Sequence, residues 1–323
     1  MKTDFKAMSK LIKDAWKVAI VGHIRPDGDC VGSCVALRLA LSKLKKSADI
    51  FIDDKIPETF SYMADYDKIR GAEYISAAQW KKYDLLILLD SSAEDRFGRC
   101  TELRANAKKV LVVDHHENTS TKGDVVVANP ARGSVGEILY EFFTAEKIEI
   151  TRDMATALYT SVATDTGCFA YATTSNTHLV AAALMEKGVD IEMINYNNFG
   201  HIKHETLAGL GYALQNLKFF LEGRVAVISI PYKIVKKYDL VGEMDYFKKY
   251  ASDARGVKVG IIASEKQKGD FYISLRSHGE VNVAKIAGEL GGGGHKNASG
   301  IVYHGKFKKI LAELLARVEE CLK

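Results

Sequence analysis

Short runs of aliphatic residues divide the first half of the chain. Four of them are continuous rather than alternating, at residues 18–21, 85–89, 110–113 and 125–128, and a weaker run lies at 50–52. Continuous aliphatic runs of this length are typical of strands that are buried on both faces, as in parallel sheets. The pattern therefore predicts a parallel sheet in this half of the chain.

Helical patterns lie between these strands, notably at residues 31–44 and 135–143. Strands that alternate with helices indicate a doubly wound α/β domain, in which ligands bind outside the carboxyl ends of the strands. Residues 151–187 also have a helical pattern, which is interrupted around 164–174. We predict that this first domain occupies residues 1–190.

The character of the chain changes after residues 191–221, which are mostly helical and fairly polar and which we interpret as a helical connector. Beyond it follow three strand-like runs, a helix, a glycine run, a further strand and an amphipathic helix, at residues 225–230, 257–263, 271–275, 281–290, 291–294, 301–303 and 307–322. This order predicts a smaller α/β domain with a mixed sheet at residues 222–323.

The composition excludes several classes of protein. Hydrophobic residues make up 47% and charged residues 27%, as in ordinary globular proteins. A net charge of only +4 does not describe a surface coated for long duplex nucleic acid. Five cysteines without a Cys-x-x-Cys pair argue against a disulfide framework or a structural zinc site. No apolar run approaches the roughly 18 residues that span a bilayer, so we expect a soluble cytoplasmic protein without a membrane partner.

Groups that can bind metal follow each of the strongest predicted strands. Parallel strands place five of them along one edge of the sheet: His23, Asp27, Asp29, Asp90 and His115. So many carboxylates cannot all ionise without a counter-charge, and a pair of divalent ions supplies one. Mixed carboxylate and imidazole ligands suit Mn²⁺, Fe²⁺ or Co²⁺, and two ions about 3.5–4 Å apart form the clamp used for phosphoryl displacement.

These residues resemble the motifs of the DHH phosphoesterase family. Residues 23–33 (HIRPDGDCVGS) are similar to its first motif, Asp90 to its second, residues 114–116 (Asp-His-His) to its third and Asp165 to its fourth. The resemblance implies two divalent metal ions, with Mn²⁺ as the expected metal, and a water activated by both ions as the nucleophile.

The resemblance also implies roles for individual residues. One ion would be held by His23, Asp27 and Asp90, and the other by Asp29, Asp90, His115 and Asp165. Asp90 would therefore bridge the two ions. Two further residues would act beside it in catalysis, with His116 stabilising the phosphate oxygens or protonating the leaving group and Asp114 orienting a histidine.

A glycine run near the end of the chain is the second candidate site. The chain has 26 glycines and 4 prolines, and residues 291–294 are four consecutive glycines, whose backbone N–H groups can approach an anionic ligand. With Arg276, this stretch resembles the DHH-associated C-terminal domain, in which an arginine and a Gly-Gly-Gly-His loop grip the terminal phosphate or base of the substrate. The predicted substrate-binding residues are Arg276, Gly292, Gly293, Gly294, His295 and Lys296.

The resemblance covers almost the whole chain and points to the stand-alone nanoRNase and pAp phosphatase branch of the family. It implies two-metal hydrolysis of phosphoester bonds in short oligoribonucleotides, in 3′-phosphoadenosine 5′-phosphate (pAp), or in both. The predicted partner is therefore a short RNA or a nucleotide. The oligomeric state is left open, with a homodimer as one alternative.

Other activities remain open at this point. The same chemistry would serve a phosphodiesterase for cyclic dinucleotides or linear di-adenylate, or a RecJ-like single-strand exonuclease. A non-catalytic nucleotide sensor is the alternative from a different class of protein. Because a sensor that has lost catalysis usually lacks a metal ligand and none is missing here, we favour an enzyme.

Overall fold

The computed structural model describes most of the chain, namely residues 5–74, 83–117, 119–200, 202–241 and 243–322. The chain divides into two compact units, Met1–His201 and Ile202–Lys323, and each unit has its own sheet and core. Within the described residues, no helix is both long enough and apolar enough to cross a membrane.

The first unit is built on a parallel sheet, as predicted. Its strands are β1 (Lys17–Val21), β2 (Ser47–Phe51), β3 (Ile69–Arg70), β4 (Tyr83–Leu89), β5 (Ala107–Asp114) and β6 (Val125–Ala128). They pair in the order β3-β2-β1-β4-β5-β6, and all five pairings are parallel. The chain moves outward from β1 to β3 and then returns to β4. The carboxyl ends of β1 and β4 therefore form a topological switch point, where doubly wound folds bind ligands.

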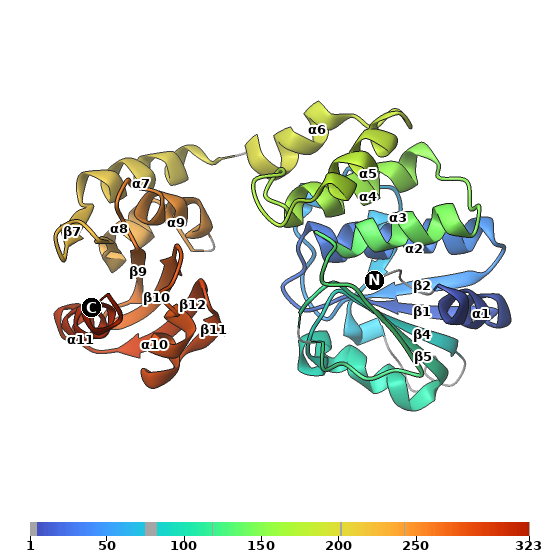
Figure 1. The fold of residues 1–323 in the computed structure, drawn as a ribbon, viewed down its shortest axis with the longest axis horizontal. Helices are drawn as coiled ribbons and strands as arrows, with labels where there is room; N and C mark the ends of the chain where they lie inside the picture. Colours follow the sequence, from blue (N-terminus) through green and yellow to red (C-terminus); the bar gives the residue numbers. More distant parts are fainter. Residues whose placement is uncertain (1–4, 75–82, 118, 201, 242, 323) are drawn as a thin grey trace. The chain divides into compact units, whose positions relative to one another are not determined.

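Helices cover both faces of this sheet (Figure 1). The described α-helices are α1 (Lys6–Asp14), α2 (Gly28–Lys43), α3 (Val135–Ala145), α4 (Arg152–Asp165), α5 (Ser175–Met185) and α6 (Ile191–Asn195). A longer run of 3₁₀ turns, η5, spans Glu94–Asn106. In β4, Ile87 and Leu89 pack with the α-helices, whereas Leu86 and Leu88 pack with Phe97 of η5. This two-sided burial explains why the strand is continuously aliphatic. The 3₁₀ segment and the two-residue β3 were not predicted, because neither has a clear hydrophobic period.

Glycines allow α2 and α4 to pack in direct contact. A Cβ on Gly32 would lie 2.4 Å from the carbonyl oxygen of Ala157, and a Cβ on Gly28 would lie 2.4 Å from the Thr164 hydroxyl oxygen. Both distances are far shorter than a van der Waals contact, so only glycine fits. The contact brings the first turn of α2 next to the last turn of α4.

The second unit has the mixed sheet that the sequence predicted. Its strands are β7 (Lys218–Phe220), β8 (Val225–Ile230), β9 (Val259–Gln267), β10 (Asp270–Ser277), β11 (Gly293–His295) and β12 (Ala298–His304). The order is β11-β12-β10-β9-β8-β7, in which β8 and β9 are parallel and the other pairs antiparallel. Its helices are α7 (His204–Gln215), α8 (Tyr232–Lys237), α9 (Asp245–Ser252), α10 (Val283–Glu289) and α11 (Phe307–Cys321).

Two parts of this unit differ from the expected elements. The glycine run was expected to be a loop, but Gly293 and Gly294 belong to edge strand β11, which pairs with β12. A tight turn at Lys296 and Asn297 folds the chain back and makes this pairing possible. The predicted connector, residues 191–221, contributes α6 to the first unit and α7 and β7 to the second.

The α2–α4 contact gives a test of the fold. We expect Gly32→Ala to lower the free energy of unfolding by about 1–3 kcal/mol, because the new methyl group overlaps the Ala157 carbonyl oxygen. Gly211→Ala in α7 is the matched control, since a Cβ there has nothing within 4 Å and alanine favours helix. Urea unfolding followed by circular dichroism measures both variants. Equal stability of Gly32→Ala and the unaltered protein would contradict the close packing.

Candidate metal centre

The predicted metal-site residues converge at the switch point of the first sheet. His23 follows β1, Asp27 and Asp29 begin α2, Asp90 follows β4, Asp114 ends β5 and is followed by His115 and His116, and Asp165 ends α4. Ligand atoms of these residues form three groups, within each of which they lie within 4.8 Å of one another: His23 with Asp27 and Asp90, Asp29 with His115 and Asp165, and Asp90 with His115 and His116. The sheet therefore brings together side chains that are up to 142 positions apart in the sequence.

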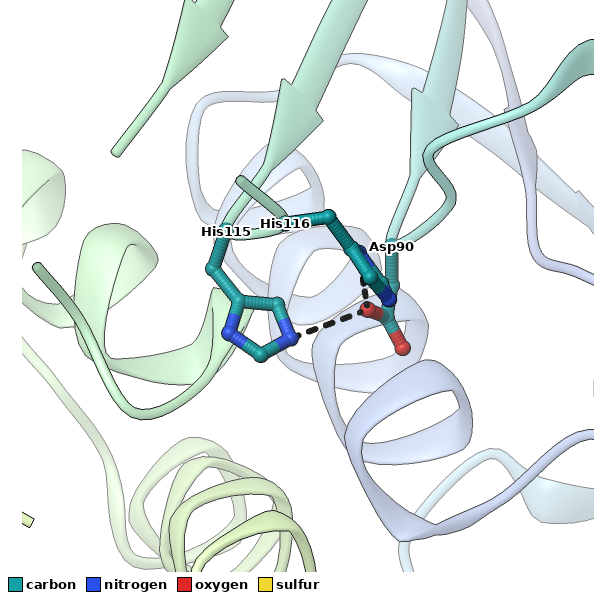
Figure 2. Close-up of side chains that lie close together, drawn as sticks. All are labelled: Asp90, His115 and His116. Carbon is teal, nitrogen blue, oxygen red and sulfur yellow. Dashed lines mark ion pairs between the residues drawn. The ribbon is translucent and has the colours of Figure 1, made fainter. Parts of the chain in front are cut away.

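Asp90 belongs to two of the three groups, and Figure 2 shows it beside His115 and His116. Its side chain is 4% exposed, and its two oxygens face different imidazoles. Oδ2 lies 3.3 Å from Nε2 of His23, and Oδ1 lies 3.5 Å from Nε2 of His115. The backbone of Asp90 is left-handed, with φ 60°, a conformation that Asp and Asn adopt more readily than most residues. The sharp turn after β4 thus places one carboxylate between two histidines.

The first group joins β1 to the start of α2. Nε2 of the buried His23 lies 3.7 Å from Oδ1 of Asp27, and its Nδ1 lies 2.9 Å from the carbonyl oxygen of Ile24. Nδ1 also lies 3.2 Å from Nη2 of Arg96, so Nε2 is the ring nitrogen that faces the carboxylates. Asp27 caps α2 by accepting a hydrogen bond of 3.1 Å from the Cys30 amide, and its side chain is largely exposed. Solvent therefore reaches this group from the Asp27 side.

The second group surrounds the other imidazole. Nε2 of His115 lies 3.2 Å from Oδ2 of Asp165 and 3.7 Å from Oδ2 of Asp29. Nδ1 of His115 lies 3.3 Å from the carbonyl oxygen of Arg132, so a proton there directs the Nε2 lone pair toward the carboxylates. Both histidines therefore present the same nitrogen, Nε2, to the centre.

Asp29 is held by groups that the sequence reasoning did not identify as part of the site. Its Oδ1 accepts hydrogen bonds from Ser33 Oγ at 2.9 Å and from Ser161 Oγ at 2.5 Å, and its Oδ2 accepts one from the Val135 amide at 2.8 Å. One signal was present in the sequence: Ser33 lies four residues after Asp29, and Ser161 four before Asp165. This spacing places each serine on the same helix face as its aspartate.

His116 is oriented by the residue that ends β5. Its Nδ1 donates to Oδ1 of Asp114 at 2.6 Å, and Asp114 also accepts hydrogen bonds from the His115 amide and from the Thr119 hydroxyl. The Asp114 side chain is fully buried, whereas that of His116 is 34% exposed. Figure 2 shows the His116 ring beside Asp90, and its Nδ1 lies 3.9 Å from Oδ1 of that carboxylate.

Among the described residues, no lysine or arginine forms an ion pair with Asp29, Asp90 or Asp165. Burial, followed by the nearby Asp90 charge, raises the pKa of Asp29 to about 7, and burial and the Asp29 charge raise the pKa of Asp165 to about 8. Burial opposes the ionisation of Asp90, but hydrogen bonds from His115 and His23 hold its pKa well below the usual range. The metal-free centre thus compensates its carboxylates with bound protons.

The pKa values of the two imidazoles are raised as well. Burial opposes the protonation of His23, but Cys30, Asp27 and Asp90 together raise its pKa to about 12. For His115 burial also opposes protonation, but the Asp90 and Asp29 carboxylates raise its pKa to about 10. A cluster that draws protons onto its carboxylates and imidazoles has the donor set and the negative charge that suit divalent cations.

The predicted substrate-binding residues of the second unit lie on one end of its sheet. Arg276 in β10 and His295 in β11 are both register partners of Ala298 in β12, one on each side of it. Lys296 follows in the adjoining turn and is exposed. The amide of Gly292 donates to the Ala287 carbonyl oxygen at 2.8 Å. For Gly292, Gly293 and Gly294 a substrate contact stays a prediction.

Comparison with known proteins identifies the class of protein. Residues 17–162 match the N-terminal domain of the DHH family, and residues 241–323 match the DHHA1 domain. The chain belongs to the DHH family of phosphoesterases and carries a DHHA1 domain, as its motifs predicted.

Individual relatives span nearly the whole chain. The bifunctional oligoribonuclease and PAP phosphatase NrnA of Mycoplasma genitalium is 29% identical over 318 residues, which are 97% of this chain and 95% of that protein. The crystal structure of an exopolyphosphatase-related protein from Bacteroides fragilis has a TM-score of 0.90 at 24% identity, and the match covers 98% of this chain and 95% of that one. The crystal structure of exonuclease RecJ bound to manganese matches with a TM-score of 0.52 at 14% identity, covering 98% of this chain and 95% of that one. The two structural similarities confirm the α/β fold.

The raised pKa values predict how the stability of the metal-free protein depends on pH. Asp29 and Asp165 keep protons to about pH 7 and 8 in the folded state but lose them near pH 4 when unfolded. Because the folded state binds more protons over this range, the free energy of unfolding falls as pH rises. His23 and His115 act in the same direction above about pH 6.5. We therefore expect a lower Tm in EDTA at pH 8 than at pH 5.5.

Scanning calorimetry with and without Mn²⁺ measures this effect. The Asp165→Asn variant should show a shallower dependence of Tm on pH in EDTA, since one of the proton-binding groups is gone. Added Mn²⁺ should raise the Tm of the unaltered protein more at pH 8 than at pH 5.5, because metal and protons compete for the same ligands. A Tm in EDTA that rises between pH 5.5 and pH 8 would contradict the assignment.

Proposed function

We propose that this protein hydrolyses phosphoester bonds in short oligoribonucleotides and in pAp, using two divalent metal ions. The observation that carries the proposal is the position of Asp90, whose two oxygens face separate imidazoles in a buried cluster of carboxylates. A carboxylate in this position has the geometry to bridge two ions. The name of the Mycoplasma genitalium relative supports the choice of substrates.

The candidate ligands form two groups, one for each ion. His23, Asp27 and Asp90 would hold one, and Asp29, Asp90, His115 and Asp165 would hold the other. When bound, such a pair lowers the pKa of water and neutralises charge on the phosphoryl oxygens. Mn²⁺ is our expected metal, because carboxylate and imidazole ligands suit it and because exonuclease RecJ, with a similar fold, binds manganese.

His116 is suited to donate a proton to the leaving oxygen. The hydrogen bond with Asp114 raises its pKa, so the imidazole is protonated at higher pH than usual. Because Nδ1 is engaged by Asp114, Nε2 is the nitrogen that remains to face a substrate. Asp114 therefore acts as a positioning residue that fixes the ring and its tautomer, and His116 as the general acid.

In this proposal, residues of the second unit bind the end of the substrate that does not react. Arg276 is partly exposed, and its guanidinium makes a hydrogen bond of 3.0 Å to the Leu275 carbonyl oxygen, which leaves further N–H groups for a ligand. An arginine pairs with a phosphate through two parallel hydrogen bonds. We propose that Arg276, His295 and Lys296 bind the terminal phosphate or base of a short substrate.

A panel of candidate substrates tests which of them the protein hydrolyses. The rate of hydrolysis under Mn²⁺, reported as kcat/KM, should be highest for RNAs of a few nucleotides and for pAp. Linear di-adenylate, cyclic dinucleotides and longer single-stranded DNA are the comparison substrates, and EDTA is the control. No turnover of any of them with Mn²⁺ present would favour a nucleotide sensor instead.

Asp90 is the residue on which hydrolysis should depend most. We expect Asp90→Asn to lower kcat/KM by roughly three orders of magnitude or more, because it removes the ligand shared by both ions. Asparagine tolerates the left-handed backbone as aspartate does, so the fold should be kept. Asp14→Asn, at an exposed position at the end of α1, is the control. Near-native turnover of Asp90→Asn with Mn²⁺ would refute the two-ion assignment.

Arg276 should affect binding rather than chemistry. We expect Arg276→Ala to raise KM for a diribonucleotide about 10- to 100-fold with little change in kcat, because the residue contacts a part of the substrate that does not react. Arg255→Ala, at an exposed arginine of the same unit, should leave both constants unchanged. An unchanged KM with a collapsed kcat would instead place Arg276 in the chemical step.

A further inference from the structure

On one face of the second unit's sheet, the described helices lie over β8 and β9 and reach as far as β10. On that face, α7, α8 and α9 pack over β8 and β9, and the buried cluster they form includes Ile228, Ile262 and Phe247. Among the described residues, this cluster contains none from β10, β11 or β12. These three strands lie together at one end of the sheet (Figure 1). Their opposite face is covered by α10 and α11. On the first face, the side chains of Tyr272 and Val302 are exposed.

The register shows which residues share the first face. Residues directly opposite each other in an antiparallel pair point to the same side of the sheet. Arg276 pairs with Ala298, Ser274 with Gly300, and Tyr272 with Val302. Arg276 and Tyr272 therefore lie on the same face of β10, with the buried Ser274 between them. The two residues are four positions apart, which corresponds to about 13 Å along a strand.

Tyr272 provides an accessible aromatic ring at the far end of this face. Its side chain is exposed, and an ideal Cβ on Gly300 would lie 3.0 Å from its hydroxyl oxygen, so the ring leans over a residue without a side chain. Val302, which is its partner on β12, is 64% exposed. Exposed aromatic rings on an open sheet are the platforms on which unpaired bases stack.

A lysine side chain lies beside the Tyr272 ring. Nζ of Lys266, at the end of β9, lies 5.4 Å from the centre of the Tyr272 ring, and the lysine side chain is exposed. Its flexible stem allows the ammonium group to move from the ring to a phosphate. A ring next to a mobile cation matches one base and one phosphate of a single-stranded chain.

The distribution of charge favours the same kind of ligand. The net charge of the whole chain is +4, and the excess of basic over acidic residues lies entirely in 202–323, because residues 1–201 carry more acidic than basic residues. The second unit is thus the basic half of the protein. The sheet face that carries Tyr272 complements a polyanion better than it complements an apolar or a cationic partner.

We propose that Tyr272 and Lys266 form a second nucleotide-binding subsite, next to the one that we assign to Arg276. Tyr272 stacks on a base and Lys266 neutralises the adjoining phosphate of a single-stranded oligoribonucleotide. The subsite selects RNA of several nucleotides, because a mononucleotide that is bound at Arg276 does not reach Tyr272. This inference rests on the proposed function, from which it takes the class of substrate.

Binding measured without catalysis tests the subsite. Labelled oligoadenylates of one to five nucleotides are titrated with the full-length protein in EDTA, and Kd is read from fluorescence anisotropy. In the unaltered protein, affinity should rise about tenfold at the length that first reaches Tyr272. Tyr272→Ala should remove this step and leave mononucleotide binding unchanged, whereas Tyr272→Phe should keep it. Lys266→Ala should reduce the slope of log Kd against log salt concentration by about 0.7 for the longer oligomers only.

Matched variants separate this role from a general loss of structure. Tyr232→Ala removes a tyrosine of almost equal exposure on α8, and Lys237→Ala removes a lysine that also lies over a tyrosine ring, at 4.7 Å. Neither should alter the dependence of affinity on length. An unchanged length step in Tyr272→Ala would overturn the subsite while leaving the proposed function standing. No binding of any oligomer by the unaltered protein would refute the proposed function and the subsite together.

Discussion

The buried carboxylates at the switch point are the constraint on which the rest of the first unit depends. Asp29 and Asp90 are almost fully buried beside Asp165, and no lysine or arginine forms an ion pair with any of them among the described residues. Isolated buried charge of this kind is too costly to persist, so it is compensated by protons in the metal-free state. Divalent cations held by the same groups would replace these protons. The stability of the fold and the chemistry of the site are therefore linked through the same atoms.

The scaffold around the centre keeps these groups in place with ordinary hydrogen bonds and close packing. Glycines let α2 and α4 touch, which brings Asp29 near Asp165, and Ser161 of α4 donates to Asp29 across the helix contact. The N-terminus of α3 adds an amide to the same carboxylate. Because three helices contribute to one side chain, the position of Asp29 is determined by packing. Such preorganised ligands lose little entropy when a metal binds.

The second unit differs from the first in the chemistry of its side chains. It contributes basic side chains and a sheet face on which Tyr272 and Val302 are exposed, whereas the first unit contributes carboxylates and imidazoles. The absence of a side chain at Gly300 leaves room for the Tyr272 ring, which leans over it. The first unit thus has a candidate site for cations, and the second unit carries the excess of basic residues, which complements a polyanion.

The sequence alone determined the fold class and most of the metal cluster, because both depend on local patterns. Continuous aliphatic runs indicated buried parallel strands, and the polar residues after each run had to meet at one edge of the sheet. The support of Asp29 by Ser161 and Val135 was decided only by the tertiary structure, since it depends on how helices far apart in the chain pack. The same holds for β11, where pairing with β12 overrides the low strand propensity of glycine. The exposed face at Tyr272 also required the structure, because an alternating strand pattern does not show which face a helix covers.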